Sequence, residues 1–518
     1  MYTESFYDVV VIGGGINGTG IAADAAGRGL SVLLCEQNDL ASATSSASSK
    51  LIHGGLRYLE EYHFSLVRES LQEREILLKT APHLVRTLRF VVPYNKLRRS
   101  FWLIRLGLFI YDLFGIGRYF KRSKMIFMDP NDPSNPLKRS IRKGFIYSDA
   151  AVDDARLVIT TALRLNRAGG VVANYTRCIS ATRTQDHWQL QLENQLNQQV
   201  YTINCKALIN AGGPFVEEIQ HSILNITGST RVKLIKGSHV IVPKLHNREE
   251  AYVLQHKDGR VVFVIPYLKQ FTLIGTTEIV YQGSPQKAKI SIAEIDYLCE
   301  VVSDYFHHPL KPEQIVHSWS GVRALVNDET SSTSSNTREY KLELLLNEQG
   351  TLPLINVLGG KLTTYRALSE KALHLLQPYF PLMGEDWTST TSLPGGDFAY
   401  EDLTSFIETL ANDFPWLSAQ LILRYAQNYG TLTYQVLKGA KSLADLGYDF
   451  GHGLYEKEVV YLVEKEWARS AEDILWRRTK LGLFLQPHEQ LELQNWLDVH
   501  FKIHSHPVMA DVTKQSIN

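Results

Sequence analysis

The hydrophobic pattern of the chain is most regular near its beginning. An unbroken apolar run, Val9 to Ile12, precedes a glycine turn and an alanine-rich stretch from Ile16 to Arg28, and a second apolar run occupies Ser31 to Cys35. Continuous apolar runs rich in β-branched residues are typical of parallel strands buried on both faces. The pattern therefore predicts a strand, a helix and a second parallel strand.

The turn between the first strand and the helix has the spacing G-x-G-x-x-G. Such a motif needs one glycine for a tight turn, one for close approach of a pyrophosphate, and one for packing of helix against strand. The helix amides then face the phosphates, and Glu36, at the end of the second strand, can accept hydrogen bonds from ribose hydroxyls. Because all these parts occur in register, we predict an adenine-dinucleotide site whose contacts include Gly13, Gly14, Gly15, Ile16, Asn17, Gly18, Glu36 and Gln37.

Small hydroxyl residues fill the segment 42–49, SATSSASS. Composition alone would suit a flexible linker. We prefer a loop and helix start under a cofactor, because small side chains allow close approach and hydroxyls donate to phosphate. The predicted contacts of this loop and its continuation are Thr44, Ser45, Ser46, Lys50, Leu51, His53, Gly54 and Gly55.

Two later segments repeat the pattern of a strand that ends in glycines. The first is 209–214, INAGGP, and the second is 354–366, LINVLGGKLTTYR. Both suit strands that return to the nucleotide fold late in the chain. They add Ala211, Gly212, Gly359, Gly360, Lys361, Leu362 and Thr363 to the predicted cofactor contacts.

The remaining pattern divides the chain further. Residues 231–282 are rich in strand-like runs, whereas helical periodicity dominates from Tyr400 onward, which predicts a helical C-terminal domain. The segment 98–124 has an apolar centre that contains Arg105 and Asp112 and is flanked by basic residues. It suits a helix lying in the headgroup layer of a membrane, and a buried core helix with basic ends explains its composition equally well.

Composition narrows the function classes. The length of 518 residues favours two or three domains. Because 54 basic residues balance 54 acidic ones, no overall field attracts nucleic acid, and we predict no nucleic-acid partner. The four cysteines are scattered, so we expect no disulfide framework, metal site or iron–sulfur cluster, and a reducing compartment. Neither a signal peptide nor a transmembrane helix is expected.

Several blocks identify a family. The chain resembles the aerobic, FAD-dependent glycerol-3-phosphate dehydrogenases of bacteria in blocks that run in order from about residue 7 to residue 500: IGGGINGTGIAADAAGRGLSVLLCE, TSSASSKLIHGGLRYLE, IKGSHVIVP, SGVRALVNDE, LGGKLTTYR and WRRTKLG. The resemblance implies FAD as cofactor, sn-glycerol 3-phosphate as donor, dihydroxyacetone phosphate as product and a quinone (ubiquinone or menaquinone) as acceptor. It also implies a peripheral protein on the cytoplasmic face of the cell membrane. The oligomeric state stays open, with a homodimer as one candidate.

The fold implied by the resemblance is of the α/β class. It combines a glutathione-reductase-like, Rossmann-type FAD domain with an inserted substrate domain of mixed or antiparallel sheet and an α-helical C-terminal domain. We place the oxidoreductase region at 1–385 and the C-terminal domain at 386–518. Within the first region we expect FAD-binding segments at about 7–60, 147–215 and 350–385, and substrate segments at about 61–146 and 216–349.

The implied reaction transfers a hydride from C2 of the donor to flavin N5 and a proton from the C2 hydroxyl to a base. Arginine suits a phosphate dianion, because its planar fork donates two parallel hydrogen bonds. We predict substrate contacts from Arg57, Tyr58, His239, Arg323, Arg338 and Lys361, with catalytic roles for Arg57, His239, Arg323 and Lys361. His239 is the candidate base because imidazole titrates near neutral pH. Asp149, Asp153 and Asp154 are expected to be structural, as helix caps.

Three other functions compete with this one. An oxidase of the same superfamily would act on an amine or amino acid, but several cations favour a phosphate over a single carboxylate. A non-catalytic nucleotide-dependent binding protein would use the C-terminal helices to recognise a partner. An NAD dehydrogenase would satisfy the first glycine motif, although the returning segments 209–214 and 354–364 suit an extended FAD better.

Overall fold

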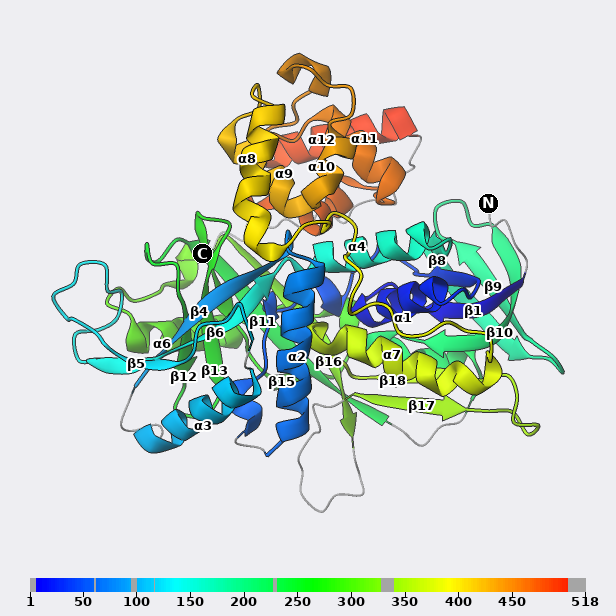
Figure 1. The fold of residues 1–518 in the computed structure, drawn as a ribbon, viewed down its shortest axis with the longest axis horizontal. Helices are drawn as coiled ribbons and strands as arrows, with labels where there is room; N and C mark the ends of the chain where they lie inside the picture. Colours follow the sequence, from blue (N-terminus) through cyan, green and yellow to red (C-terminus); the bar gives the residue numbers. More distant parts are fainter. Residues whose placement is uncertain are drawn as a thin grey trace.

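The computed structural model describes residues 6–59, 62–94, 100–115, 117–226, 231–327 and 340–501. Two sheets lie side by side, and a group of helices from the C-terminal part of the chain lies above them (Figure 1).

The first sheet carries the predicted nucleotide fold. Its strands follow the order β17-β18-β10-β1-β2-β7, of which β18, β10, β1, β2 and β7 are parallel, and β8 and β9 extend it as an antiparallel hairpin beside β10. The strands are β1 (Phe6–Ile12), β2 (Val32–Cys35), β7 (Val171–Ala173), β8 (Thr176–Arg183), β9 (Trp188–Asn194), β10 (Val200–Asn210), β17 (Lys341–Leu345) and β18 (Leu354–Leu358).

Three helices pack together against this sheet: α1 (Ile16–Gly27), α4 (Asp154–Arg167) and α7 (Tyr365–Leu376). Val9 and Val11 point to these helices, whereas Val10 and Ile12 point to the opposite face, where the β8–β9 hairpin packs. Burial on both faces explains the unbroken apolar run that begins the chain. The predicted order of strand, glycine turn, helix and parallel strand is confirmed.

The second sheet is mixed and mainly antiparallel, with β4 and β12 as a parallel pair. Helix α6 (Ile292–Tyr305) covers one face, and α2 (Phe64–Thr80) and α3 (Phe101–Phe114) pack on the other. Its strands are β3 (Leu51–Ile52), β4 (Val85–Pro93), β5 (Lys124–Phe127), β6 (Lys143–Val152), β11 (Arg231–Pro243), β12 (Ala251–Gln255), β13 (Val261–Tyr267), β14 (Phe271–Gly275), β15 (Ile279–Val280) and β16 (His317–Asn327).

The boundaries between the two sheets differ from the boundaries predicted between FAD-binding and substrate segments. Residues 147–152, predicted to belong to the FAD-binding part, lie in β6 of the second sheet, and residues 341–345, predicted to belong to the substrate part, form β17 of the first. The sequence of a strand does not reveal which sheet the strand joins, because its pairing partners are distant in sequence.

The last part of the chain forms a helical group with its own core, and it includes α8 (Leu403–Asp413), α9 (Ala419–Tyr429), α10 (Thr433–Val436), α11 (Glu456–Lys465) and α12 (Pro487–Phe501). Buried ion pairs join it to the first sheet: Arg156 of α4 contacts Glu466, and Asp39 contacts both Arg477 and Arg478. Across the described ranges, none of the helices combines the length and apolarity needed to cross a bilayer.

Candidate functional site

The glycine turn after β1 is built for close contact. Gly13 has a φ of +115°, and a Cβ at Gly18 would lie 1.9 Å from the Gly13 carbonyl oxygen. A Cβ at Gly13 would lie 2.5 Å from the Ala211 carbonyl oxygen, so the returning strand β10 closes on the same turn. At Gly15 a Cβ would meet only the Ser45 hydroxyl. The turn therefore leaves open backbone where α1 begins, which suits a pyrophosphate.

Glu36 lies at the carboxyl end of β2, directly beside this turn. Its carboxylate accepts hydrogen bonds from the amides of Gly14, at 2.7 Å, and Asn38, at 2.9 Å. Burial raises the pKa of Glu36, and these amide hydrogen bonds oppose the rise. Because each oxygen has a further lone pair, the same carboxylate can accept from ribose hydroxyls.

The loop after Glu36 crosses from the first sheet to the second, where β3 pairs with β6. Its hydroxyls are fixed by long-range hydrogen bonds: Thr44 Oγ1 donates to the Val322 carbonyl at 2.5 Å, Ser45 Oγ accepts from the Ile16 amide at 3.0 Å, and Ser48 Oγ donates to Asp154 at 2.8 Å. The flexible-linker alternative is therefore wrong. The loop instead lies between the two sheets, where a dinucleotide that starts at Gly15 would continue.

The glycine turn after β18 reaches the same place. Gly359 and Gly360 have φ values of +77° and +98°, and the Asn17 amide donates to the Gly359 carbonyl at 3.1 Å. Asn17 Oδ1 is buried and has no hydrogen-bond partner among the described residues. Such an atom needs a polar ligand group, and it fits an extended dinucleotide lying along this turn.

Lys361 follows this turn and lies against residues from the 51–59 segment. Its ammonium is 3.8 Å from the centre of the Tyr58 ring, a cation–π contact. The His53 amide donates to Thr363 Oγ1 at 3.2 Å, which ties the two segments together. The structure thus brings the predicted residues Lys361, Tyr58 and Thr363 into one place.

His239 lies on β11, opposite Trp319 of β16, and the two rings stack with centres 5.6 Å apart. Its Nε2 shares a hydrogen bond of 2.8 Å with Ser49 Oγ, while its Nδ1 is buried without a hydrogen-bond partner in the described part of the chain. Burial lowers the pKa of His239 to about 3, and the charges of Lys50 and Arg323 add to this effect. The imidazole is therefore neutral near pH 7.

The β16 strand presents a polar side to the cofactor loop. Trp319, Gly321 and Arg323 alternate along one side of it, and a Cβ at Gly321 would lie 2.9 Å from the Ala47 carbonyl oxygen. Arg323 Nη2 lies 3.6 Å from where a Cβ at Gly237, on β11, would be. The predicted residues His239 and Arg323 therefore share one face of the second sheet, which is turned toward the 42–49 loop.

Two predicted arginines have no described geometry. Arg57 lies in the short 3₁₀ helix η2 (Leu56–Leu59), but its side chain falls outside the described residues, and Arg338 lies outside them entirely. Their roles stay predictions.

Sequence reasoning missed several partners of this site. Ser49 and Trp319, neither of which was predicted, contact His239. Lys50, a predicted cofactor contact, pairs with Asp154 at 2.6 Å, and this pairing was not predicted. Trp319 could have been found from the alternation along its strand, because it lies four residues before Arg323. Ser49 carried no signal that separates it from the other serines around it.

Of the aspartates expected to cap helices, the structure confirms a cap for Asp153 but not for Asp149. Asp153 caps α4 by accepting from the Arg156 amide at 3.0 Å, as predicted. Asp149 is not a cap, since it lies within β6, is buried, and binds Arg74 and the Tyr111 hydroxyl, each at 2.7 Å. The Tyr111 hydroxyl also accepts from the Gly54 amide at 2.9 Å. A buried network therefore joins α3 to the predicted cofactor loop.

The other side of α3 is exposed. Among the side chains of this helix only Leu108 and Tyr111 are buried, whereas Trp102 is 77% exposed and Phe109 57% exposed. The buried-core alternative for this segment is therefore wrong. Exposed cations follow the helix: Arg118, Lys121, Arg122 and Lys124. Arg98 and Arg99, which precede it, lie outside the described residues.

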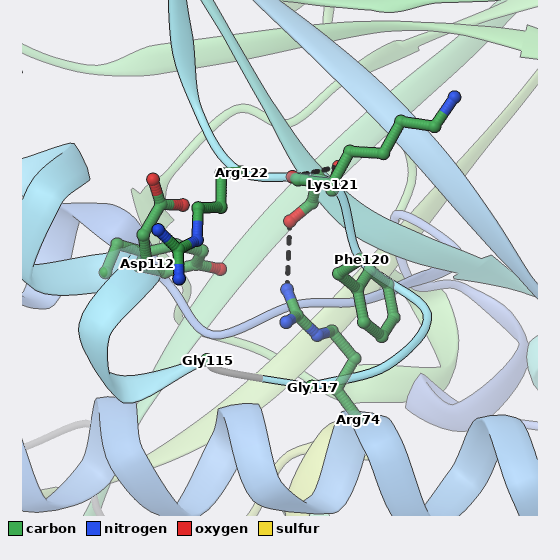
Figure 2. Close-up of a pocket in the computed structure, with 9 residues that line it drawn as sticks. Arg74, Asp112, Gly115, Gly117, Phe120, Lys121 and Arg122 are labelled. Atoms are coloured by element: carbon green, nitrogen blue, oxygen red, sulfur yellow. Dashed lines mark hydrogen bonds between the residues drawn. The ribbon is translucent and has the colours of Figure 1, made fainter.

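A cavity of about 100 Å³ lies where α3 ends (Figure 2). The Arg74 guanidinium donates to the Ser148 carbonyl at 2.9 Å and lies 3.6 Å from the Phe120 ring centre, while the Lys121 side chain points away from both. The nearby carboxylates of Asp112, Glu75 and Asp149 offset the cations and disfavour a phosphate here. The cavity is separate from the groups around His239.

Comparisons with known proteins agree with this geometry. The family described as "FAD dependent oxidoreductase" matches residues 8–366, and "C-terminal domain of alpha-glycerophosphate oxidase" matches residues 387–496. The chain is 52% identical to a glycerol-3-phosphate dehydrogenase of Pseudomonas aeruginosa, with 95% of each chain covered. It is 47% identical to the aerobic glycerol-3-phosphate dehydrogenase of Escherichia coli and 44% identical to the D-erythritol 1-phosphate dehydrogenase of Brucella abortus, each comparison covering 95% of this chain and 97% of the relative.

A solved structure shares the whole architecture. The glycerol-3-phosphate dehydrogenase from Bacillus halodurans, complexed with FAD, superposes with a TM-score of 0.73 at 25% identity, covering 97% of this chain and 95% of that one.

Proposed function

This chain belongs to the FAD-dependent oxidoreductases, in the family of aerobic glycerol-3-phosphate dehydrogenases, and from that premise we propose that it oxidises sn-glycerol 3-phosphate to dihydroxyacetone phosphate and passes the electrons to a membrane quinone. The observation that carries the proposal is the position of His239. A buried, neutral imidazole, whose Nδ1 has no hydrogen-bond partner among the residues that the structure describes, lies where the dinucleotide cradle of the first sheet meets the cationic face of the second.

The residues present fit FAD. The open backbone at Gly15 supplies a site for a pyrophosphate, the carboxylate of Glu36 a site for a ribose, and the buried oxygen of Asn17 a site for a further polar group. FAD, when bound, supplies the flavin N5 that accepts the hydride from C2 of the substrate. The protein has to hold the substrate, exclude water and remove one proton.

The phosphate of the substrate requires cations. Arg323 and Lys361 are the described candidates, and Arg57 and Arg338 complete the proposed clamp. Lys361 is held against the Tyr58 ring, which keeps its ammonium in one place without neutralising it. A fixed ammonium and a planar guanidinium together match a dianion better than the single carboxylate of an amino acid.

His239 would accept the proton of the C2 hydroxyl. Its pKa is depressed by burial and by the neighbouring cations Lys50 and Arg323. A bound phosphate dianion would offset the effect of those cations on the pKa of His239, while the larger effect of burial would remain. Ser49, hydrogen-bonded to Nε2, fixes the orientation of the ring.

In this proposal α3 docks the protein on the membrane that contains the quinone acceptor. The exposed apolar side of this helix and the cations that follow it suit a bilayer with anionic headgroups, into which Trp102 and Phe109 would insert. Docking there would bring the site to a lipophilic quinone. The proposed location is therefore peripheral, on the cytoplasmic face of the cell membrane, and a homodimer remains a prediction.

Anaerobic flavin reduction tests the reaction. The protein is purified in mild detergent, its visible spectrum is recorded, and sn-glycerol 3-phosphate is added. We expect bleaching near 450 nm, about where oxidised flavin absorbs, and recovery on addition of a soluble quinone. A flavin that stays oxidised contradicts the donor, and a reduced flavin that only oxygen reoxidises contradicts the acceptor.

A second donor has support from one comparison. The 44% identity to a D-erythritol 1-phosphate dehydrogenase makes a longer polyol phosphate a second candidate, because the same phosphate clamp would hold it. Rates of flavin reduction by the two donors, each at several concentrations, separate the candidates. A higher kcat/KM for D-erythritol 1-phosphate would replace the leading proposal.

A further inference from the structure

One segment of the C-terminal helical group contacts residues that follow a strand of each sheet, Asp39 after β2 and Asp153 after β6. This segment is WRRTKLG, residues 476–482, and Arg477 and Arg478 in it bind the buried carboxylate of Asp39. Lys480 follows with a φ of +62°, a left-handed conformation that lysine rarely adopts. Its side chain is 6% exposed. The backbone is therefore held in an unfavourable conformation that delivers a buried ammonium to one place.

That place is the beginning of α4, where four charged groups form two pairs. Lys480 Nζ lies 3.0 Å from Asp153 Oδ1, and Lys50 Nζ lies 2.6 Å from Asp154 Oδ1. Lys50 is also buried and also has a left-handed backbone, with a φ of +57°. Each lysine thus has one of two adjacent carboxylates, and the four charges sum to zero.

Lys50 connects these pairs to the proposed site. Its ammonium donates to the Ser46 carbonyl at 3.1 Å and lies 4.8 Å from the centre of the Trp319 ring. Trp319 stacks on His239, and the residue before Lys50, Ser49, holds His239 Nε2. A displacement of Lys50 would therefore disturb His239 through two contacts, one with Trp319 and one with Ser49.

We propose that Lys480 is a positioning residue of the flavin site: by pairing with Asp153 it leaves Lys50 paired with Asp154, and so keeps Lys50, Ser49 and Trp319 in the arrangement that orients His239. The C-terminal domain is then part of the site although it contributes no residue to the substrate clamp. This inference rests on the proposed role of His239.

The physical reason is competition for one ammonium. Burial raises the pKa of Asp153, but the charges of Lys480 and then Lys50 outweigh burial, and the pKa lies below its usual value. Asp153 is therefore an anion that already interacts with both lysines. Without Lys480, Asp153 is a partly buried anion that draws Lys50 away from Asp154, because an unpaired charge in a low-dielectric region is unfavourable.

A suppression experiment on the FAD-loaded protein tests this. Lys480→Met removes the charge and nearly keeps the volume, and Asp153→Asn removes the competing anion but keeps a helix cap, since asparagine caps as well as aspartate. We expect Lys480→Met to lower the rate of flavin reduction by substrate about tenfold and to alter the shape of the flavin absorption band. The double variant Lys480→Met/Asp153→Asn should recover most of the rate of flavin reduction and most of the original shape of the absorption band.

A crystal structure of each variant supplies a readout that does not depend on activity. In Lys480→Met the Lys50 ammonium should lie nearer Asp153, and in the double variant it should return to Asp154. If the wild-type flavin is not reduced by sn-glycerol 3-phosphate at all, the proposed function fails, while the position of Lys50 and the flavin band still test the inference.

Lys438→Met serves as the matched control, because Lys438 is an exposed lysine of the same domain and lies outside the site. It should behave as wild type. Additive damage in the double variant, an unmoved Lys50, or the same loss in Lys438→Met would overturn the inference. If Lys480→Met does not fold but the double variant does, the competition with Asp153 is supported.

Discussion

At the scale of single residues, the environment of a side chain decides its chemistry more than its type does. His239 lies on β11, whereas His246 lies in the loop that follows this strand. Both are buried, and burial lowers the pKa of His246 to about 4. Only His239 faces Ser49, Trp319 and the cations of the proposed site. The same residue type therefore has the position that we propose to be catalytic in one case and a packing position in the other.

Replacing His239 by asparagine should lower kcat for flavin reduction by about 10²- to 10⁴-fold, the range typical of losing a general base. The FAD absorption band should remain, because the ring lies on the second sheet and the cradle on the first. Stopped-flow reduction measures the effect. His246→Asn is the matched control and should keep kcat, and equal losses in the two variants would contradict the assignment.

At the scale of elements, the two sides of α3 lie in different environments: one side contacts the rest of the protein and the other is exposed. Tyr111 binds Asp149 and the Gly54 amide on the inner side, while Trp102 and Phe109 are exposed on the outer side. A helix on the surface of a soluble protein usually places polar residues outward, so this arrangement indicates a partner that takes apolar side chains.

Replacing Phe109 by aspartate should weaken binding to anionic vesicles at least tenfold, because full burial of a phenylalanine contributes about 1.5–3 kcal/mol and a carboxylate is repelled by the surface. Co-sedimentation with vesicles measures the bound fraction, and absorbance near the flavin band checks that FAD remains. Leu382→Asp, at a leucine that is 98% exposed elsewhere, is the control. Unchanged sedimentation of Phe109→Asp would show that α3 does not enter the lipid.

At the scale of the whole molecule, buried ion pairs hold the C-terminal helices to the first sheet. Asp39, which follows β2 and is fully buried, forms ion pairs with both Arg477 and Arg478. Arg156 of α4 forms an ion pair with Glu466. Breaking such a pair leaves a charge buried without compensation.

Asp39→Asn should therefore lower the free energy of unfolding by about 3–5 kcal/mol. Denaturant unfolding measures it. Glu472→Gln is the matched control: Glu472 contacts the same Arg477 at 3.0 Å but is 60% exposed, and its loss should cost less than about 1 kcal/mol. Equal effects of the two substitutions would show that the interface does not depend on burial of the pair.

The junction of the helical group also makes stability depend on pH. Burial, and then the charge of Arg156, lowers the pKa of His83 from 6.5 to about 3, and neither ring nitrogen has a hydrogen-bond partner in the described residues. Between these two values the unfolded chain binds a proton that the folded protein does not. Stability therefore falls as the pH falls from about 6.5 toward 3, by about 1.4 kcal/mol per pH unit for this group.

His83→Phe should remove that contribution, so its stability between pH 6 and pH 4 should fall less steeply than that of the wild type by about 1.4 kcal/mol per unit. Denaturant unfolding at a series of pH values gives the two slopes. His488→Phe, at an exposed histidine of α12, should keep the wild-type slope. Parallel curves for His83→Phe and the wild type would contradict the prediction.

The nucleotide half of the molecule was predictable from local pattern alone. The apolar run at Val9–Ile12, the glycine spacing from Gly13 to Gly18 and the acid at Glu36 act within one short stretch of chain, so each constraint is visible in the sequence. The returning strands β10 and β18 were found for the same reason, because each ends in its own glycines.

The second sheet and the surroundings of His239 were decided only by tertiary structure. The sheet to which β6 and β17 each belong depends on pairing between strands distant in sequence, which the sequence of one strand does not encode. Lys480 meets Asp153, and Trp319 meets His239, across separations that no local pattern spans. The sequence by itself therefore determined the adenine-dinucleotide site, since glycine spacing and strand burial are local, and the resemblance of its blocks indicated the family. Only the folded chain determined which charges face one another, because electrostatic pairing depends on distance in space.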